Sequence, residues 1–176
     1  MHPVVDQRSL LSRYLEGPDL LEQAVADLDD AHLDARPSQG GWTIRQIVHH
    51  VVDGDDLWET CIKAALGNEE GEFTMQWYWE LPQDAWAERW RYAQRPLAVS
   101  LALFRATRAH IAQLLEHVPD GWSRSVRVRT PRGTERLSVR AVVEMQSDHV
   151  AHHVERIGAI RAELGDSHDL RSPLDP

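Results

Sequence analysis

Histidine is unusually frequent in this 176-residue chain: there are ten, and two pairs are adjacent, His49-His50 and His152-His153. Neutral imidazole is the commonest metal ligand among side chains. His149 and His153 are four residues apart, so in a helix they share a face with Cβ atoms about 6 Å apart. Both rings would then reach one cation. The spacing predicts a metal site, with ordinary surface histidines as the alternative.

Helical periodicity indicates which histidines face the interior. The apolar residues between Val139 and Leu164 recur on one face of a helix and define a buried stripe. At about 100° per residue, His153 lies about 60° from the centre of this stripe and His149 about 100°. His152 points nearly the opposite way. We therefore expect His149 and His153 near the interior, and His152 in solvent.

A second apolar stripe, between Ile44 and Ile62, predicts another amphipathic helix. His50 lies at the edge of its buried face, and His49 points away from that face. Gly54 follows His50 by one turn, where the absence of a side chain would either leave space for a ligand or allow close helix packing. His50 is thus a candidate third ligand from a different helix.

Three neutral histidines would leave one coordination position of a metal open, as in catalytic sites, whereas structural sites usually have four protein ligands. A metal with an open position can activate a water or a thiol. The chain lacks the glutamate of zinc proteases, because residue 150 is Val, so we exclude that class. Asp53, Glu144 and Asp148 could orient a ligand through a hydrogen bond, although such carboxylates are more often solvated.

The remaining pattern predicts an all-α protein, a four-helix bundle with a small β-hairpin before the last helix. The expected helices run from Asp6 to about Asp30, from Thr43 to Leu66, from Gln83 to His117 with an interruption near Pro96, and from Ser138 to Leu164. Gly17-Pro18 would kink the first helix or divide it. Residues 123–137 alternate polar and apolar around a Thr-Pro-Arg-Gly turn, which is typical of a hairpin. We expect one domain over residues 1–165 and a flexible tail over residues 166–176.

Charge and composition argue against several kinds of partner. A net charge of −9 argues against nucleic acid. No apolar run is long enough to span a membrane, and no export signal is visible, so we expect a cytoplasmic protein. The single cysteine, Cys61, would lie about 16 Å along its helix from His50, which makes it a poor nucleophile for this site. Four tryptophans could line a substrate mouth, but belong more often to a core or dimer contact: Trp77, Trp79, Trp86 and Trp90.

Two segments together resemble the DinB/YfiT-like family: Gly41-Trp-Thr-Ile-Arg-Gln-Ile-Val-His-His-Val-Val-Asp53 and Asp148-His-Val-Ala-His-His-Val-Glu-Arg-Ile157. The family pattern has one histidine early in the second helix and His-x-x-x-His on the last. It therefore places the metal ligands at His50, His149 and His153. The middle of the chain is similar through Trp86, Tyr92, Phe104, Arg105 and the Pro131-Arg-Gly133 turn. That turn reads Thr-Pro-Arg-Gly here, in place of the family's His-Pro-Glu-x-Gly, so the role of its His and Glu does not transfer.

The resemblance implies a four-helix bundle, usually a homodimer, that binds zinc or nickel. Some relatives are thiol S-transferases that use bacillithiol, mycothiol or glutathione, one branch isomerises maleylpyruvate with mycothiol, and YfiT-like proteins are labelled metal-dependent hydrolases. For this chain it implies a metal-dependent transferase that joins a low-molecular-weight thiol to a small-molecule electrophile. A metal-dependent hydrolase and a non-catalytic, stress-related metal-binding protein remain the alternatives.

Overall fold

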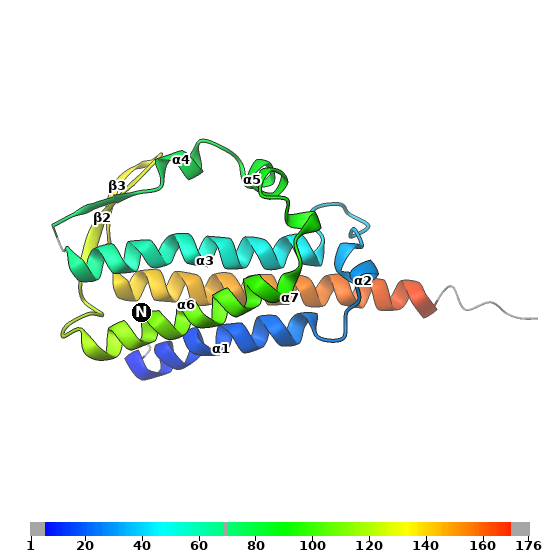
Figure 1. Cartoon of the computed structure of the whole chain (residues 1–176), viewed down its shortest axis with the longest axis horizontal. Helices are drawn as coiled ribbons and strands as arrows, with labels where there is room; N and C mark the ends of the chain where they lie inside the picture. Colours follow the sequence, from blue (N-terminus) through cyan, green and yellow to red (C-terminus); the bar gives the residue numbers. More distant parts are fainter. Residues whose placement is uncertain (1–5, 69, 170–176) are drawn as a thin grey trace, which may run out of the picture.

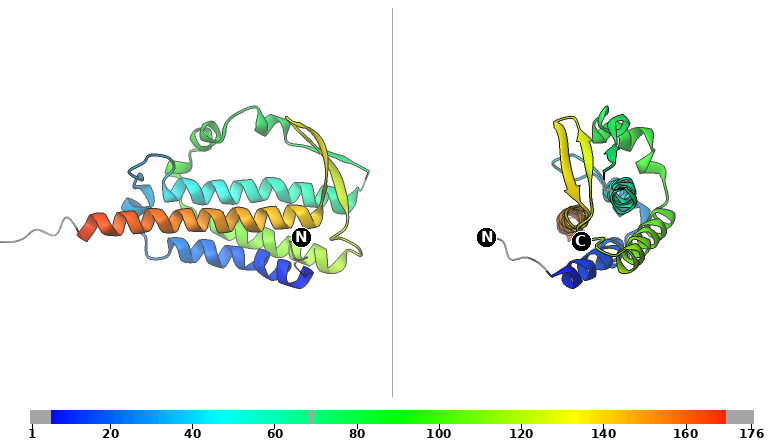
Figure 2. Two further views of the ribbon diagram at one scale, coloured as in Figure 1. Left: turned by 180° about the vertical axis from the view of Figure 1, so that it is seen from behind. Right: turned by 90° about the vertical axis from the view of Figure 1, so that its left-hand side faces the viewer.

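Four long helices run side by side and form the body of the molecule (Figure 1). They are α1 (Gln7–Val25), α3 (Ile44–Gly67), α6 (Leu97–His117) and α7 (Val139–Asp169). Helices α1 and α3 each pack against both α6 and α7, and the end-on view in Figure 2 shows all four around one axis. The computed structural model describes residues 6–68 and 70–169, with side chains up to residue 165. The predicted four-helix bundle is confirmed.

Two of the long helices, α3 and α7, begin with the capping residues that the sequence predicted. Thr43 precedes α3, and its hydroxyl accepts a hydrogen bond from the Gln46 N–H at 3.3 Å, while the Gln46 side chain accepts from the Thr43 N–H at 3.0 Å. Ser138 caps α7 by accepting from the Ala141 N–H. At its other end α7 continues through Gly165, where we expected it to stop, to Asp169. Residues 170–176 of the predicted tail lie outside the described residues.

Helix α1 runs unbroken through Pro18, so of the two alternatives for Gly17-Pro18, a kink or a division, the division is wrong. Proline has no N–H, and the Tyr14 carbonyl one turn earlier loses its helical partner. Arg108 of α6 replaces that partner, because its Nη1 donates to this carbonyl at 2.6 Å. A Cβ at Gly17 would clash with the same guanidinium. The Gly-Pro pair thus makes room for Arg108 instead of breaking the helix.

The chain between α3 and α6 forms short elements over one side of α3 (Figure 1). They are β1 (Glu72–Thr74), α4 (Gln76–Trp79), α5 (Gln83–Arg89) and the 3-10 helix η1 (Tyr92–Gln94). The expected helix from Gln83 to His117 is therefore interrupted earlier and more widely than predicted. It ends at Arg89, since Arg91 adopts a left-handed conformation with φ 56°. A new helix, α6, starts after Pro96.

The predicted hairpin is confirmed as β2 (Ser125–Thr130) and β3 (Gly133–Ser138), which pair antiparallel. Several short elements were not expected, α4 and η1 among them. Strand β1 pairs with β2 in parallel and extends the hairpin to three strands in the order β1-β2-β3, and a short helix, α2 (Asp30–Asp34), follows α1. None of the helices in the described ranges is both long and apolar enough to cross a membrane.

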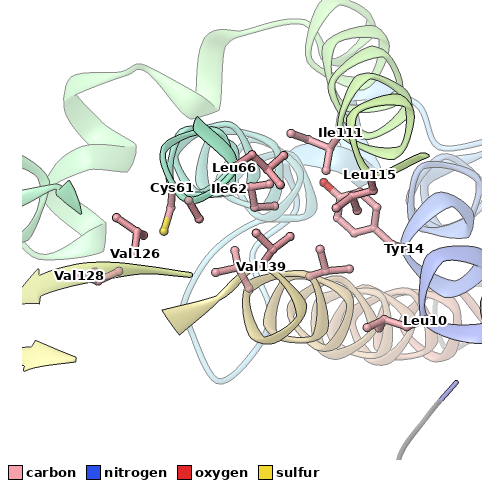
Figure 3. Close-up of a cluster of buried hydrophobic side chains, with 13 residues drawn as sticks. Leu10, Tyr14, Cys61, Ile62, Leu66, Ile111, Leu115, Val126, Val128 and Val139 are labelled. Carbon is pink, nitrogen blue, oxygen red and sulfur yellow. The ribbon is translucent and has the colours of Figure 1, made fainter. Parts of the chain in front are cut away.

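The buried core consists of two apolar clusters separated by a polar layer. One cluster, shown in Figure 3, lies toward the hairpin and includes Tyr14, Cys61 and Val126. The other surrounds residues 44–52 of α3 and residues 150–160 of α7. Polar side chains lie at the level between them, and they are Asp55, Glu59, Arg108 and Gln146. The metal-site candidates on α3 and α7 are next to this layer in sequence.

Candidate metal centre

Three histidine side chains converge between α3 and α7. The Nε2 atom of His149 lies 3.1 Å from Nε2 of His50 and 3.1 Å from Nε2 of His153. Within the described ranges they are the one group of three or more His, Cys, Asp or Glu side chains whose ligand atoms lie so close together. The structure therefore brings together the three histidines that the sequence predicted, and no fourth protein ligand from the described part of the chain lies with them.

The arrangement of these nitrogens fits a single metal ion. An imidazole nitrogen has either one proton or one in-plane lone pair, so Nε2 of His149 cannot make two good hydrogen bonds, one to each neighbour. Nitrogens that lie 2.0–2.1 Å from one tetrahedral zinc are about 3.3 Å apart. The observed 3.1 Å is close to this value. One divalent cation would therefore satisfy all three nitrogens at once.

The three rings are uncharged at neutral pH. Burial, helped by the charges of His149 and Arg156, lowers the pKa of His50 to about 4. Burial likewise lowers the pKa of His149 to about 4 and that of His153 to about 3. Metals bind the unprotonated imidazole. The site thus presents its nitrogens in the form that a metal requires, without first losing protons.

An aromatic ring lies against one of the three histidines. The Trp42 ring contacts His50 edge-on, with ring centroids 4.7 Å apart. The Nδ1 atoms of His50 and His153 are buried and have no hydrogen-bond partner among the described residues. This poor solvation favours the neutral rings, which agrees with their lowered pKa values.

Within the described residues, no hydrogen bond joins any of the predicted supporting carboxylates to these rings. Asp53 accepts from Arg95 Nη1 at 2.9 Å, and Asp148 accepts from Arg13 Nη1 at 2.9 Å on the surface. Glu144 pairs with Arg140 one turn earlier on α7. Each carboxylate therefore has an arginine partner, and the possibility that it orients a site histidine is not supported by these contacts.

In each of the two adjacent histidine pairs, one residue belongs to the candidate site and the other does not. His152 is exposed, as predicted. His49 was expected to point away from the buried face, yet it is 0% exposed. Its Nε2–H donates to the Arg95 carbonyl at 2.9 Å, and its Nδ1 then accepts from Ser100 Oγ at 3.0 Å. The prediction was wrong because α6 and η1 cover a second face of α3, whereas the wheel assumed a single buried face.

A cavity of about 190 Å³ opens beside His50 and His149. Its wall is mainly apolar and aromatic, with Trp58, Trp79 and Met145 among its residues. Gly54 also lines it, and a Cβ there would lie 3.8 Å from His149 Cε1, an ordinary contact. Close packing therefore does not require a glycine at this position, and the interpretation that Gly54 leaves ligand space is favoured.

Of the four tryptophans singled out in the sequence, only Trp79 lines this cavity. Trp77, Trp86 and Trp90 instead pack around Tyr78, with ring centroids 5.6–6.1 Å from it. This cluster holds the segment that covers α3. Sequence reasoning missed Trp58, Tyr78, Met145 and Gln146 as cavity residues, although Met145 and Gln146 precede His149 by about one turn, which places them on the same side of α7.

Cys61 is not part of the site. It lies in the apolar cluster near the hairpin, and burial raises the pKa of its thiol to about 12. A thiol with such a pKa has almost no thiolate at neutral pH. The prediction that Cys61 is not a nucleophile here agrees with this position.

Sequence comparison now identifies the family. The sequence profile of the DinB superfamily matches residues 13–157, so the chain belongs to this superfamily. It is 30% identical over 147 residues to a Bacillus mycoides (strain KBAB4) protein named "Putative metal-dependent hydrolase", covering 84% of this chain and 80% of that one. A protein of the same name from Geobacillus thermodenitrificans is 26% identical over 161 residues, covering 91% of this chain and 86% of that one.

Two solved structures share the fold. YfiT from Bacillus subtilis, described as "a probable metal-dependent hydrolase with an unusual four-helix bundle topology", superposes with a TM-score of 0.78 at 23% identity, over 94% of this chain and 93% of that one. A mycothiol-dependent maleylpyruvate isomerase superposes with a TM-score of 0.65 at 17% identity, over 88% of this chain. The match spans 61% of the isomerase, which is the longer protein.

Proposed function

We propose that this DinB superfamily protein binds one divalent metal ion, zinc or nickel, through His50, His149 and His153, and that the site is catalytic. The observation that supports this most directly is the convergence of three Nε2 atoms next to a cavity. With three protein ligands, a position toward the cavity stays available to a small molecule. A closed structural site would need a fourth side chain.

The proposed reaction is transfer of a low-molecular-weight thiol to an electrophile. Bound metal would supply a positive charge that lowers the pKa of a coordinated thiol. Three neutral imidazoles leave that charge uncompensated, which favours an anionic fourth ligand such as a thiolate. In the balanced reaction the sulfur forms a bond to the electrophilic carbon, the leaving group departs with the electron pair of the broken bond, and the thiol proton goes to solvent.

The residues around the cavity support a mechanism in which the thiol loses its proton before it attacks the electrophile. Asp55 is the carboxylate of the cavity wall, but both of its oxygens accept from Arg108, at 2.7 and 3.2 Å. It is therefore poorly suited to take a proton from a substrate. A nucleophile that has already lost its proton needs no such base. The chain's own contribution is to hold three neutral ligands and to shield the electrophile behind Trp58 and Trp79.

Hydrolysis is the second candidate, and the names of the curated relatives favour it. Water can use the same open position as a thiol. The maleylpyruvate isomerase with this fold depends on mycothiol, which favours a thiol. Both reactions therefore have to be measured on the same metal-loaded protein, together with a non-catalytic role as the outcome if neither occurs.

The test begins with metal content. Elemental analysis of gently purified protein should give one divalent metal per chain. His153→Ala should abolish tight binding, while the matched variant His152→Ala should keep it, because His152 is exposed on the same helix. Equal losses in the two variants, or no metal in the unmodified protein, would contradict the proposed site.

Activity is then measured with equal metal loading. Small thiols with a haloaromatic or epoxide electrophile should react faster with the protein than without it, and ester and amide substrates are tested in parallel. The thiol rate should disappear on chelation and in His50→Ala and His149→Ala. Metal-dependent hydrolysis without thiol transfer would favour the second candidate, and stoichiometric metal with neither activity would favour a non-catalytic protein.

A further inference from the structure

The side chain of Trp79 borders two cavities. One is the cavity of about 190 Å³ beside His50 and His149. The other has a volume of about 470 Å³ and is lined by residues of α4 and by the end of the hairpin, including Arg129 and Thr130. Among the described residues, Trp79 is the one that lines both cavities. The candidate metal centre is therefore close to a second, larger space, and one indole borders on both.

Trp79 is the last residue of α4, the short helix that Figure 1 shows between the hairpin and α5, over α3. Its half-buried indole packs against the apolar cluster near the hairpin. Trp77, two residues earlier on the same helix, is 50% exposed and packs against Tyr78 instead. The two indoles of α4 thus have different surroundings, and Trp79 is the one that forms part of the cavity wall.

The volume of the cavity beside the histidines limits the group that it can hold. An apolar cavity of about 150 Å³ holds one benzene molecule, so this cavity of about 190 Å³ has room for one aromatic ring with a small substituent. Its wall includes Trp58, Trp79 and Met145, and apolar side chains of this kind disfavour a charged group. A longer ligand would need the second cavity as well, and Trp79 lies where the two meet.

We infer that Trp79 is a specificity-determining residue, whose indole closes the cavity on the side of the hairpin and limits the bound group to the length of about one aromatic ring. The ligand class is a small, uncharged compound with a single ring, which the indoles of the wall can contact by stacking. A compound longer by one ring is excluded. As a description of the electrophilic substrate, this inference rests on the proposed function, whereas the limit on length does not require the metal.

Removal of the indole should join the two cavities. A second ring on the ligand would then be buried in the space that Trp79 and the second cavity provide, and burial of a ring raises affinity by about tenfold or more. In the unmodified protein the same ring has to stay at the mouth of the cavity or in water, where it adds little. Two ligands that differ in length by one ring therefore measure the role of Trp79.

The experiment uses 4-fluorobenzyl alcohol and (4′-fluorobiphenyl-4-yl)methanol, titrated by ¹⁹F NMR into the zinc-loaded full-length chain. The two alcohols have the same end groups, and neither is an anion that would compete for the metal. We expect Trp79→Ala to increase the affinity for the longer alcohol, relative to the shorter one, by about tenfold or more. An unchanged ratio of the two dissociation constants, or no binding of the shorter alcohol to the unmodified protein at millimolar concentration, would overturn the inference.

Trp77→Ala is the matched control, because it removes an indole from the same helix at a position that lines neither of the two cavities. It should leave the ratio unchanged. Trp79→Leu keeps an apolar side chain against the neighbouring cluster and should change the ratio in the same direction as Trp79→Ala, which covers the case in which the alanine variant does not fold. Gly54→Val, which fills the cavity, should weaken the binding of both alcohols. Equal changes in the Trp77→Ala and Trp79→Ala variants would contradict the assignment.

Backbone amide resonances show where the second ring binds. In Trp79→Ala, the N–H signals of Arg129 and Thr130 should shift when the longer alcohol is added and stay in place with the shorter one, because both residues line the second cavity. A gain in affinity without these shifts would mean that the second ring lies elsewhere, and it would refute the role of Trp79 as the wall between the cavities.

The same titrations in the His153→Ala background separate this inference from the proposed function. His153 does not line the cavity, so the effect of Trp79→Ala on the ratio should survive when the metal site is destroyed. A protein that binds no metal but shows this effect would refute the proposed function alone. A protein that binds metal and reacts with thiols, yet shows no change of the ratio in Trp79→Ala, would refute only the role of Trp79.

Discussion

Because the carboxyl of Glu59 is buried, we expect it to lower the free energy of unfolding as the pH rises. Glu59 is 1% exposed in the polar layer between the two apolar clusters, and neither oxygen has a hydrogen bond among the described residues. It pairs with Lys63, whose Nζ lies 3.6 Å from Oε2. Burial therefore raises the pKa of Glu59 from 4.5 to about 7, and the charge of Asp55 adds to this. Replacement by the isosteric amide in Glu59→Gln would remove the ionisation and keep the shape.

The raised pKa of Glu59 determines the size and the sign of the change in unfolding free energy that Glu59→Gln should cause. A rise from 4.5 to about 7 corresponds to about 3 kcal/mol, at about 1.4 kcal/mol for each pKa unit. Between these two pH values the folded state holds a proton that the unfolded state has lost, so the contribution of Glu59 to stability falls as pH rises. Glu59→Gln should therefore be more stable than the unmodified protein by about 1–3 kcal/mol at pH 8, and by almost nothing below pH 4.5.

Urea unfolding of both proteins with excess chelator, at several pH values from 4.5 to 8, measures this difference. The histidines titrate in both proteins, so their contributions cancel when the two unfolding free energies are subtracted. Glu116→Gln, at an exposed position of α6, is the control and should change the unfolding free energy by less than about 0.5 kcal/mol. A difference for Glu59→Gln that is independent of pH, or a loss of stability at pH 8, would refute the argument.

Two further substitutions test the packing of the site. Gly54→Ala should raise the unfolding free energy by about 0.5–1 kcal/mol, because glycine is unfavourable inside a helix and the added Cβ has room; destabilisation in urea would show that close packing needs the glycine. Arg108→Met should lower the unfolding free energy by about 3–5 kcal/mol, because it leaves Asp55 buried without its cation. Arg108→Met/Asp55→Leu should recover part of that loss, and a double variant no more stable than Arg108→Met would contradict this.

Much of the fold was accessible from the sequence because its determinants are local. Periodic apolar positions, the Thr43 capping box and the alternation around the Thr-Pro-Arg-Gly turn predicted the four long helices and the hairpin. Several ends were wrong, because α1 stops at Val25 and α7 continues to Asp169. The same periodicity predicted which three histidines converge. His149 and His153 are related by helix geometry alone, and His50 requires only that two buried faces meet.

The features that sequence reasoning missed depend on partners from distant segments. The pairing of β1 with β2 joins residues 72–74 to residues 127–129, and a three-residue strand has no recognisable alternation. His49 is buried by contacts from η1 and α6, which a wheel of α3 cannot include. The hydrogen bond from Gln146 to the Asp55 carbonyl gives no signal in the sequence, because it depends on how α7 lies against α3.

Arg108 explains why the sequence suggested a break in α1 where the structure has none. From α6, this one side chain donates to the Tyr14 carbonyl of α1, to the Asp55 carboxylate of α3 and to the Gln146 carbonyl of α7. Pro18 frees the first acceptor and Gly17 leaves space for the guanidinium. These bonds are directional, so they are satisfied in only one axial register of the four helices, whereas apolar contacts tolerate sliding. Because Asp55 and Gln146 also line the cavity, the register that satisfies Arg108 is the one that brings His50 level with His149.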